Sequence, residues 1–158
     1  MSIRVALVED DDEIRRQTVA RLNAEPDIEC VGEYCAAEGL LAAMDHIRPE
    51  VVLMSIGLPG QDGIACVRHL KPLYPSVEFV MFTAQCSLVL EAIHAGATGY
   101  ILKPESPVAA VREVKAGGLP LSADVAPILT GFYHSVNQGD VDEVTPAVRG
   151  VLSRFCFD

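Results

Sequence analysis

Short apolar runs alternate with amphipathic stretches along the first 118 residues of the chain. The runs at 3–8, 50–54 and 77–82 are dense in branched and aliphatic residues without polar alternation, which is typical of strands buried on both faces of a sheet. The runs at 28–34 and 98–102 are more polar, so we expect them nearer the sheet edges. The alternation predicts βαβ units with right-handed crossovers, and therefore an α/β, doubly wound domain on a five-stranded parallel sheet.

The amphipathic stretches between these runs predict helices. Within 12–24, Ile14, Thr18 and Leu22 recur at four-residue spacing while the arginines point elsewhere, which indicates a helix with one core-facing stripe. Further helices are predicted at 36–47, 64–74, 86–95 and 106–117.

The strand and helix rhythm ends close to residue 118, so residues 1–121 are predicted to form one domain. Residues 122–135 predict an extra C-terminal helical segment with Ser122 as its N-cap. The polar residues 136–144 are interpreted as a linker, and residues 145–158 as the first helix of a further unit.

Composition excludes several classes of protein. The formal net charge is −10, which argues against broad nucleic-acid binding, because contact with phosphates depends on lysine and arginine. Charged residues interrupt every apolar run before the roughly 20 residues that a membrane span needs, and the N-terminus has no signal-peptide pattern, so we expect a cytoplasmic protein. Five cysteines without a C-x-x-C pair fit neither a disulfide framework nor a zinc site.

Polar residues follow four of the five predicted strands. In an open α/β sheet, functional groups gather beyond the carboxyl ends of the strands. The groups placed there are the acidic run ending in Asp10 and Asp11, then Ser55 with its loop through Gly57, then Thr83, and then Lys103. We therefore expect these side chains to converge on one pocket.

Four motifs carry a resemblance to a known family. They are VALVEDDDEIR, VVLMSIGLPGQDGI, FTAQ and AGATGYILKPESP, at spacings that together cover about residues 3–122. The sequence resembles the receiver domain of two-component response regulators, of the NarL/LuxR-type subfamily. The resemblance implies the flavodoxin-like receiver fold.

The resemblance also implies roles for individual residues. Asp10 and Asp11, with the Gly57 carbonyl, would bind a divalent cation, while Thr83 and Lys103 would contact a phosphoryl group. Tyr100 resembles the aromatic residue that changes rotamer when receivers are activated. Simpler interpretations remain beside these: Asp10 or Asp11 as a helix cap, Thr83 as an ordinary strand-end residue, and Tyr100 as a half-buried edge-strand tyrosine.

Ser55 departs from the family pattern, because it stands where the phosphoaccepting aspartate is expected. A serine hydroxyl needs a base to remove its proton before it attacks phosphorus, and the sequence shows none placed to do so. Phosphotransfer from a histidine kinase is therefore not expected. With one carboxylate fewer, Mg²⁺ should bind weakly or not at all, and no other cofactor is expected.

Two hypotheses about function follow. The first is an atypical receiver, without enzymatic activity, that acts by phosphorylation-independent protein–protein interaction. The alternative is a fragment or truncated form of a DNA-binding two-component transcriptional regulator, because VTPAVRGVLSRF resembles the start of a LuxR-type helix-turn-helix. No recognition helix follows that start, so DNA binding by this chain is not expected.

Apolar surface suggests the kind of partner. Residues 86–95 and 125–133 are more apolar than a single core-facing stripe requires. We therefore expect a homodimer, built either on the face formed by the fourth and fifth predicted helices or on the extra helix at 122–135. The open alternative is that residues 125–133 fold back onto their own domain.

Overall fold

The computed structural model describes residues 2–137 and shows a five-stranded parallel sheet in the order β2-β1-β3-β4-β5. The strands are β1 (Ile3–Val8), β2 (Ile28–Tyr34), β3 (Val51–Met54), β4 (Glu78–Thr83) and β5 (Gly99–Leu102). Every pairing between neighbouring strands is parallel. The predicted fold class is confirmed.

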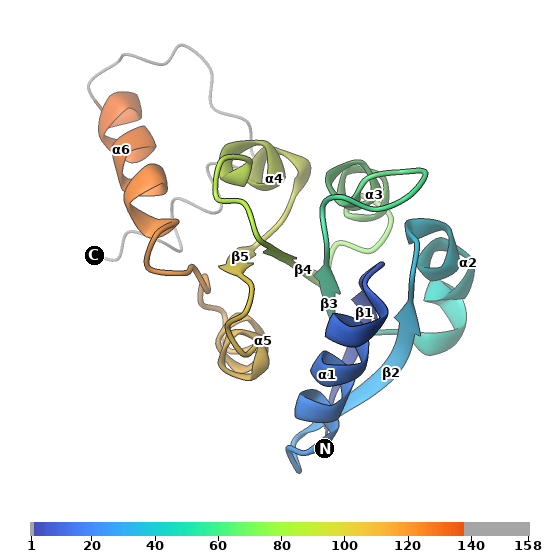
Figure 1. Ribbon diagram of the computed structural model, residues 1–158. Helices are drawn as coiled ribbons and strands as arrows, with labels where there is room; N and C mark the ends of the chain where they lie inside the picture. The colour runs from blue at the N-terminus through green and yellow to red at the C-terminus, as the bar shows by residue number, and fades with distance from the viewer. Residues whose placement is uncertain (1, 138–158) are drawn as a thin grey trace.

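Two layers of helices enclose this sheet (Figure 1). α1 (Asp12–Asn23) and α5 (Val108–Lys115) pack on one face, where Leu22 and Val111 join the core. α2 (Ala37–Ile47), α3 (Gly63–Leu70) and α4 (Val89–Ala95) pack on the other face. The three-layer arrangement leaves the carboxyl ends of the strands open at one edge of the sheet.

Burial along the strands follows the expected order. All four residues of β3 are buried, as are the last four of β1 and the last five of β4, because helices cover both faces of these central strands. In β2, at one edge, only Ile28 is buried. β5 forms the other edge, as predicted.

Several helices are shorter than the sequence pattern predicts. α3 ends at Leu70 rather than residue 74, since Pro72 cannot continue the hydrogen-bond ladder. α4 begins at Val89 rather than residue 86, and α5 begins at Val108, directly after Pro107. These differences are confined to the helix ends.

The C-terminal helix α6 (Ala126–Asn137) begins four residues later than predicted. Ser122 is not its N-cap, so that prediction is wrong. The Ser122 hydroxyl instead accepts a hydrogen bond from the Leu102 backbone N–H at 2.7 Å and donates one to Glu105. The Ser122 hydroxyl therefore binds the backbone at the end of β5 instead of capping α6.

Residues 120–122 lie alongside β5 and connect the domain to α6. Tyr100 donates its N–H to the Pro120 carbonyl at 2.9 Å, and Ser122 donates its N–H to the Tyr100 carbonyl at 3.2 Å. Val125 and Leu129 are fully buried, and α6 packs on α4 (Figure 1). The structure thus has the folded-back arrangement of residues 125–133.

The predicted helix at 145–158 and all but the first two residues of the predicted linker at 136–144 lie outside the described residues. Among the residues that are described, no helix has the length and apolar character needed to cross a membrane.

Candidate functional site

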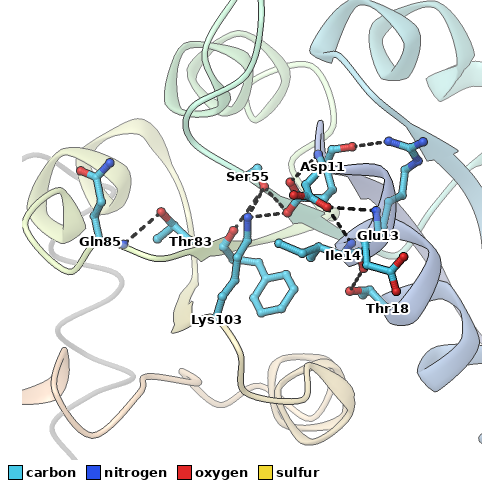
Figure 2. Close-up of polar contacts among 11 residues, drawn as sticks. Asp11, Glu13, Ile14, Thr18, Ser55, Thr83, Gln85 and Lys103 are labelled. Carbon is cyan, nitrogen blue, oxygen red and sulfur yellow. Dashed lines mark hydrogen bonds and ion pairs between the residues drawn. The ribbon is translucent and has the colours of Figure 1, made fainter.

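Three side chains meet at the carboxyl edge of the sheet, one each from the ends of β1, β3 and β5. The Lys103 ammonium forms an ion pair with Oε1 of Glu9. It also donates a hydrogen bond to Oγ of Ser55 at 3.1 Å, and the Ser55 hydroxyl donates to the same Glu9 oxygen at 2.9 Å. These contacts form a closed triangle, in which Figure 2 shows Ser55 and Lys103 joined by a dashed line.

The triangle is largely withdrawn from solvent. Glu9 is 1% exposed and Ser55 is 3% exposed, while the side chain of Lys103 is 19% exposed. The Lys103 ammonium also lies 5.7 Å from the centre of the Phe82 ring. A buried carboxylate therefore has its counter-ion within the same chain, which is the condition under which burial of a charge is tolerated.

Strand geometry positions Glu9. Its N–H donates to the Tyr34 carbonyl at 2.9 Å, so the ladder between β1 and β2 extends one residue beyond β1. The Glu9 carbonyl accepts a hydrogen bond from Arg15 at 2.8 Å. Burial by itself would raise the pKa of Glu9, but the hydrogen bonds from Lys103, the Asp11 N–H and Ser55 outweigh it and hold the pKa below its ordinary value.

Asp11 caps a helix in this structure. Its carboxylate accepts hydrogen bonds from the N–H groups of Glu13 and Ile14 at 2.9 and 3.0 Å, which makes it the N-cap of α1. Asp10 is exposed. The capping alternative, left open by the sequence, is the arrangement that the structure shows for Asp11.

Glu9 is the residue that the sequence argument missed. It belongs to the acidic run after the first predicted strand, whereas the site residues predicted there are Asp10 and Asp11. Alternation along β1 was the available signal: Val5 and Leu7 pack on the face of the sheet that also holds Phe82, and Glu9 continues their parity. The side chain two residues after Leu7 is therefore directed to the side on which Lys103 lies.

Ser55 follows β3 and donates its N–H to the Val8 carbonyl at 3.0 Å. The Ser55 carbonyl lies so close to the start of α3 that a Cβ on Gly63 would come within 1.8 Å of it. Residue 63 must be glycine for α3 to begin here, because any side chain would displace the end of β3. The Gly63 N–H also donates to the Ile56 carbonyl at 2.9 Å, so the loop after β3 is held against the start of α3.

Thr83 and Tyr100 belong to a second hydrogen-bond chain. Oγ1 of Thr83 accepts the Gln85 N–H at 3.3 Å, and the Tyr100 hydroxyl donates to the Gln85 carbonyl at 2.5 Å. The Lys103 backbone N–H donates to the Thr83 carbonyl at 2.8 Å, but within residues 2–137 no hydrogen bond joins the Thr83 side chain to the side chains of Glu9, Ser55 or Lys103.

Tyr100 is fully buried rather than half-buried. Burial raises the pKa of its hydroxyl to about 12. As placed, the ring is directed inward and bound to the backbone after β4.

The divalent cation implied by the family resemblance does not fit the side chains as they are placed. Oε1 of Glu9 is taken by Lys103 and Ser55, Oε2 accepts the Asp11 N–H at 3.1 Å, and Asp11 caps α1. No group of three or more His, Cys, Asp or Glu side chains that could hold a metal ion occurs in the described part of the chain. A hard cation prefers several oxygen ligands, and here the ammonium of Lys103 occupies the position beside the buried carboxylate.

The fold and this pocket define a class. A doubly wound sheet with an acid, a hydroxyl residue and a lysine converging at its carboxyl edge is a signalling domain of the receiver type. The response regulator receiver domain model matches residues 5–115, and the chain belongs to that family.

Similar proteins include full-length transcriptional regulators. The chain is 33% identical to the DNA-binding transcriptional activator DevR/DosR of Mycobacterium tuberculosis over 118 residues, covering 73% of this chain and 54% of that protein. It is 27% identical to the nitrate/nitrite response regulator protein NarL of Escherichia coli over 156 residues, covering 94% of this chain and 72% of that protein. The chain thus spans about half the length of DevR/DosR.

Solved structures agree with the fold. A crystal structure of a two-component response regulator of the LuxR family from Aurantimonas sp. SI85-9A1 has a TM-score of 0.73 and 27% identity, covering 80% of this chain and 94% of that chain.

Proposed function

We propose that this chain is an atypical receiver that signals by protein–protein interaction, without phosphorylation of Ser55. The observation that carries the proposal is the closed triangle of Glu9, Ser55 and Lys103. The Ser55 hydroxyl is buried and already donates to Glu9 while it accepts from Lys103. An incoming phosphoryl donor would have to break these bonds before it reached Oγ.

The chemistry of Glu9 supports the same proposal. Its carboxylate accepts a hydrogen bond from the Ser55 hydroxyl and is therefore the group placed as a base, but the hydrogen bond from the Lys103 ammonium holds its pKa low. A carboxylate with a lowered pKa is a weak base for an alcohol. The pair therefore stabilises the pocket rather than activating the serine, and no catalytic step is assigned to the chain.

Acetyl phosphate labelling tests this proposal. With acetyl phosphate and Mg²⁺, the intact mass of the wild type should stay unchanged, whereas Ser55→Asp should acquire an acid-stable but hydroxylamine-labile phosphoryl adduct. Ser55→Ala is the matched control for labelling elsewhere. A phosphoryl adduct on the wild-type protein that resists hydroxylamine, as a serine phosphoester does, and that is absent from Ser55→Ala would refute the proposal.

A second candidate function is that of a piece of a DNA-binding two-component regulator. The similarity to NarL favours it, because the match covers 94% of this chain and so extends beyond the receiver domain. A gel-shift assay tests whether the chain itself binds DNA. The interaction module leaves DNA mobility unchanged at all protein concentrations, whereas a functional DNA-binding unit retards a specific fragment.

We infer that the partner includes a second copy of the chain. The face of α4 is the favoured segment, since Leu90 is only partly buried there, whereas Val125 and Leu129 of the extra segment are buried within their own domain. Light scattering should give a dimeric mass for the wild type and a monomeric mass for Leu90→Asp. A monomeric wild type at high concentration would exclude the homodimer.

A further inference from the structure

A groove of about 520 Å³ lies at the amino ends of the strands, at the opposite edge of the sheet from Ser55. It is formed where the C-terminal ends of α2 and α5 and the turn after α3 approach the residues just before β3 and β4. Its volume falls within the range of about 300–1,000 Å³ that small-molecule sites occupy. Glu9, Ser55 and Lys103 are not among the residues that line this groove.

One part of the groove wall is apolar, and charged residues lie beside it. Met44 and Val77 contribute buried side chains, 1% and 8% exposed. The ring of Tyr74 stands beside them, held by a 2.6 Å hydrogen bond from its hydroxyl to Oδ1 of Asp45. A flat or aliphatic body can therefore lie against a surface whose aromatic ring has a fixed orientation.

The charged groups on the rim are not equivalent. Lys115 forms an ion pair with Glu50 at 3.0 Å, and Asp45 accepts the Tyr74 hydroxyl. Arg48 differs, because only its Nε makes a hydrogen bond, to the Asp45 carbonyl at 3.4 Å. Within residues 2–137 its two Nη groups have no partner. A guanidinium with free Nη groups is suited to bind a planar or tetrahedral anion through two parallel hydrogen bonds.

The backbone of Arg48 gives an independent observation. Its φ is +45°, and it is the sole non-glycine residue with positive φ in the described part of the chain. It occupies the left-handed position at the end of α2, where glycine or asparagine is the usual residue. Arg4 supports this position by donating to the carbonyls of Ile47 and Arg48 at 2.5 and 3.3 Å. A side chain kept where glycine would be less strained points to a function for that side chain.

We propose that this groove is a binding site for a small organic anion, a carboxylate or sulfonate carried on an apolar or aromatic body. Arg48 pairs with the anionic group, and Met44, Val77 and Tyr74 contact the body. The site is separate from the Ser55 pocket and does not depend on whether Ser55 is phosphorylated. The domain would then have a ligand-binding site at the amino ends of its strands, opposite to the pocket that contains Ser55.

Two fluorescent probes with the same aromatic skeleton test the proposal on the full chain. 8-Anilinonaphthalene-1-sulfonate carries the anion, and N-phenyl-1-naphthylamine lacks it. The sulfonate should bind the wild type saturably at one site and perturb the backbone amide resonances of Ser76 and Val77. Arg48→Gln should weaken sulfonate binding at least tenfold and leave the neutral probe unchanged.

Two matched variants serve as controls. Arg21→Gln removes the same charge from an exposed arginine on α1 and should leave both affinities unchanged. Ser76→Phe fills the groove and should abolish binding of both probes while the urea midpoint stays close to that of the wild type. Equal affinities in Arg48→Gln and Arg21→Gln, or perturbed resonances confined to other regions, would overturn the proposal.

Arg48→Gly distinguishes a binding role from a structural one. Glycine relieves the left-handed conformation, so the melting temperature should be unchanged or higher, while sulfonate affinity should fall as in Arg48→Gln. A variant that loses melting temperature together with affinity would assign Arg48 to the fold, and the proposed site would be wrong.

Discussion

Removing Lys103 should destabilise the fold more than removing the charge of its partner Glu9. Lys103→Met leaves the Glu9 carboxylate in an environment where it is 1% exposed, with only the Ser55 hydroxyl and the Asp11 N–H as donors. Glu9→Gln leaves an ammonium whose side chain is 19% exposed and able to extend into water. Loss of Lys103 should therefore lower the free energy of unfolding more than loss of the Glu9 charge.

The expected magnitudes follow from burial. Breaking a buried ion pair by removing one partner costs about 3–5 kcal/mol, which we expect for Lys103→Met. Glu9→Gln should cost about 1–3 kcal/mol, since the remaining charge can be hydrated. The double variant Glu9→Gln/Lys103→Met removes both charges and should be more stable than Lys103→Met alone, with a coupling energy of at least about 2 kcal/mol.

Urea unfolding of the four proteins measures these differences, with the m-value as the check that the unfolded states are comparable. The pH dependence provides a second test. The folded-state pKa of Glu9 is lowered below its ordinary value of 4.5, so the stability that the pair contributes is complete above that pH. It is lost as the pH falls through the folded-state pKa, and the difference between the wild type and Glu9→Gln should shrink in that acidic range.

Two results would refute this reasoning. Strictly additive effects in the double-variant cycle would mean that Glu9 and Lys103 do not depend on each other. A Lys103→Met variant no less stable than Glu9→Gln would mean that the Glu9 carboxylate is solvated, contrary to its burial.

Three further predictions concern the family site and the C-terminal segment. Millimolar Mg²⁺ should raise the melting temperature of Ser55→Asp more than that of the wild type, because stabilisation follows the ratio of ligand concentration to dissociation constant, and equal shifts would contradict the donor-set argument. Leu129→Asp should unfold or strongly destabilise the protein, as judged by circular dichroism, since Leu129 is fully buried, and a folded, well-behaved variant would mean that α6 is not docked on α4. Ser122→Ala should lower the free energy of unfolding by about 1–3 kcal/mol, because the Leu102 N–H loses its acceptor, whereas the exposed control Ala123→Ser should have little effect in the same urea titration.

The sequence by itself determined the architecture. Dense apolar runs without polar alternation at β1, β3 and β4 predicted buried central strands, and the more polar β2 and β5 predicted edges, because a parallel sheet covered by helices leaves no solvent face to the central strands. The position of the pocket also followed from the sequence, since residues just after parallel strands must meet at one edge. Helix ends were less well determined, because proline and side-chain contacts shift them by several residues.

Only the tertiary structure decided which acidic side chain enters the pocket. Glu9, Asp10 and Asp11 are adjacent in sequence, yet the first is buried against Lys103, the second is exposed and the third caps α1. Successive side chains of a strand point to opposite faces of the sheet, so the side on which an acidic residue lies depends on where the strand ends. The hydrophobic pattern alone does not fix the last residue of β1.

The tertiary structure also decided where the C-terminal helix and the groove lie. Val125 and Leu129 are as apolar as an interface would require, but docking of α6 on α4 buries them within the chain. The groove around Arg48 is formed by Met44, Tyr74 and Val77, among others, from segments that no local pattern relates. Periodicity reports which residues are buried, whereas the partner that buries them depends on contacts between distant segments, and only the folded chain specifies those.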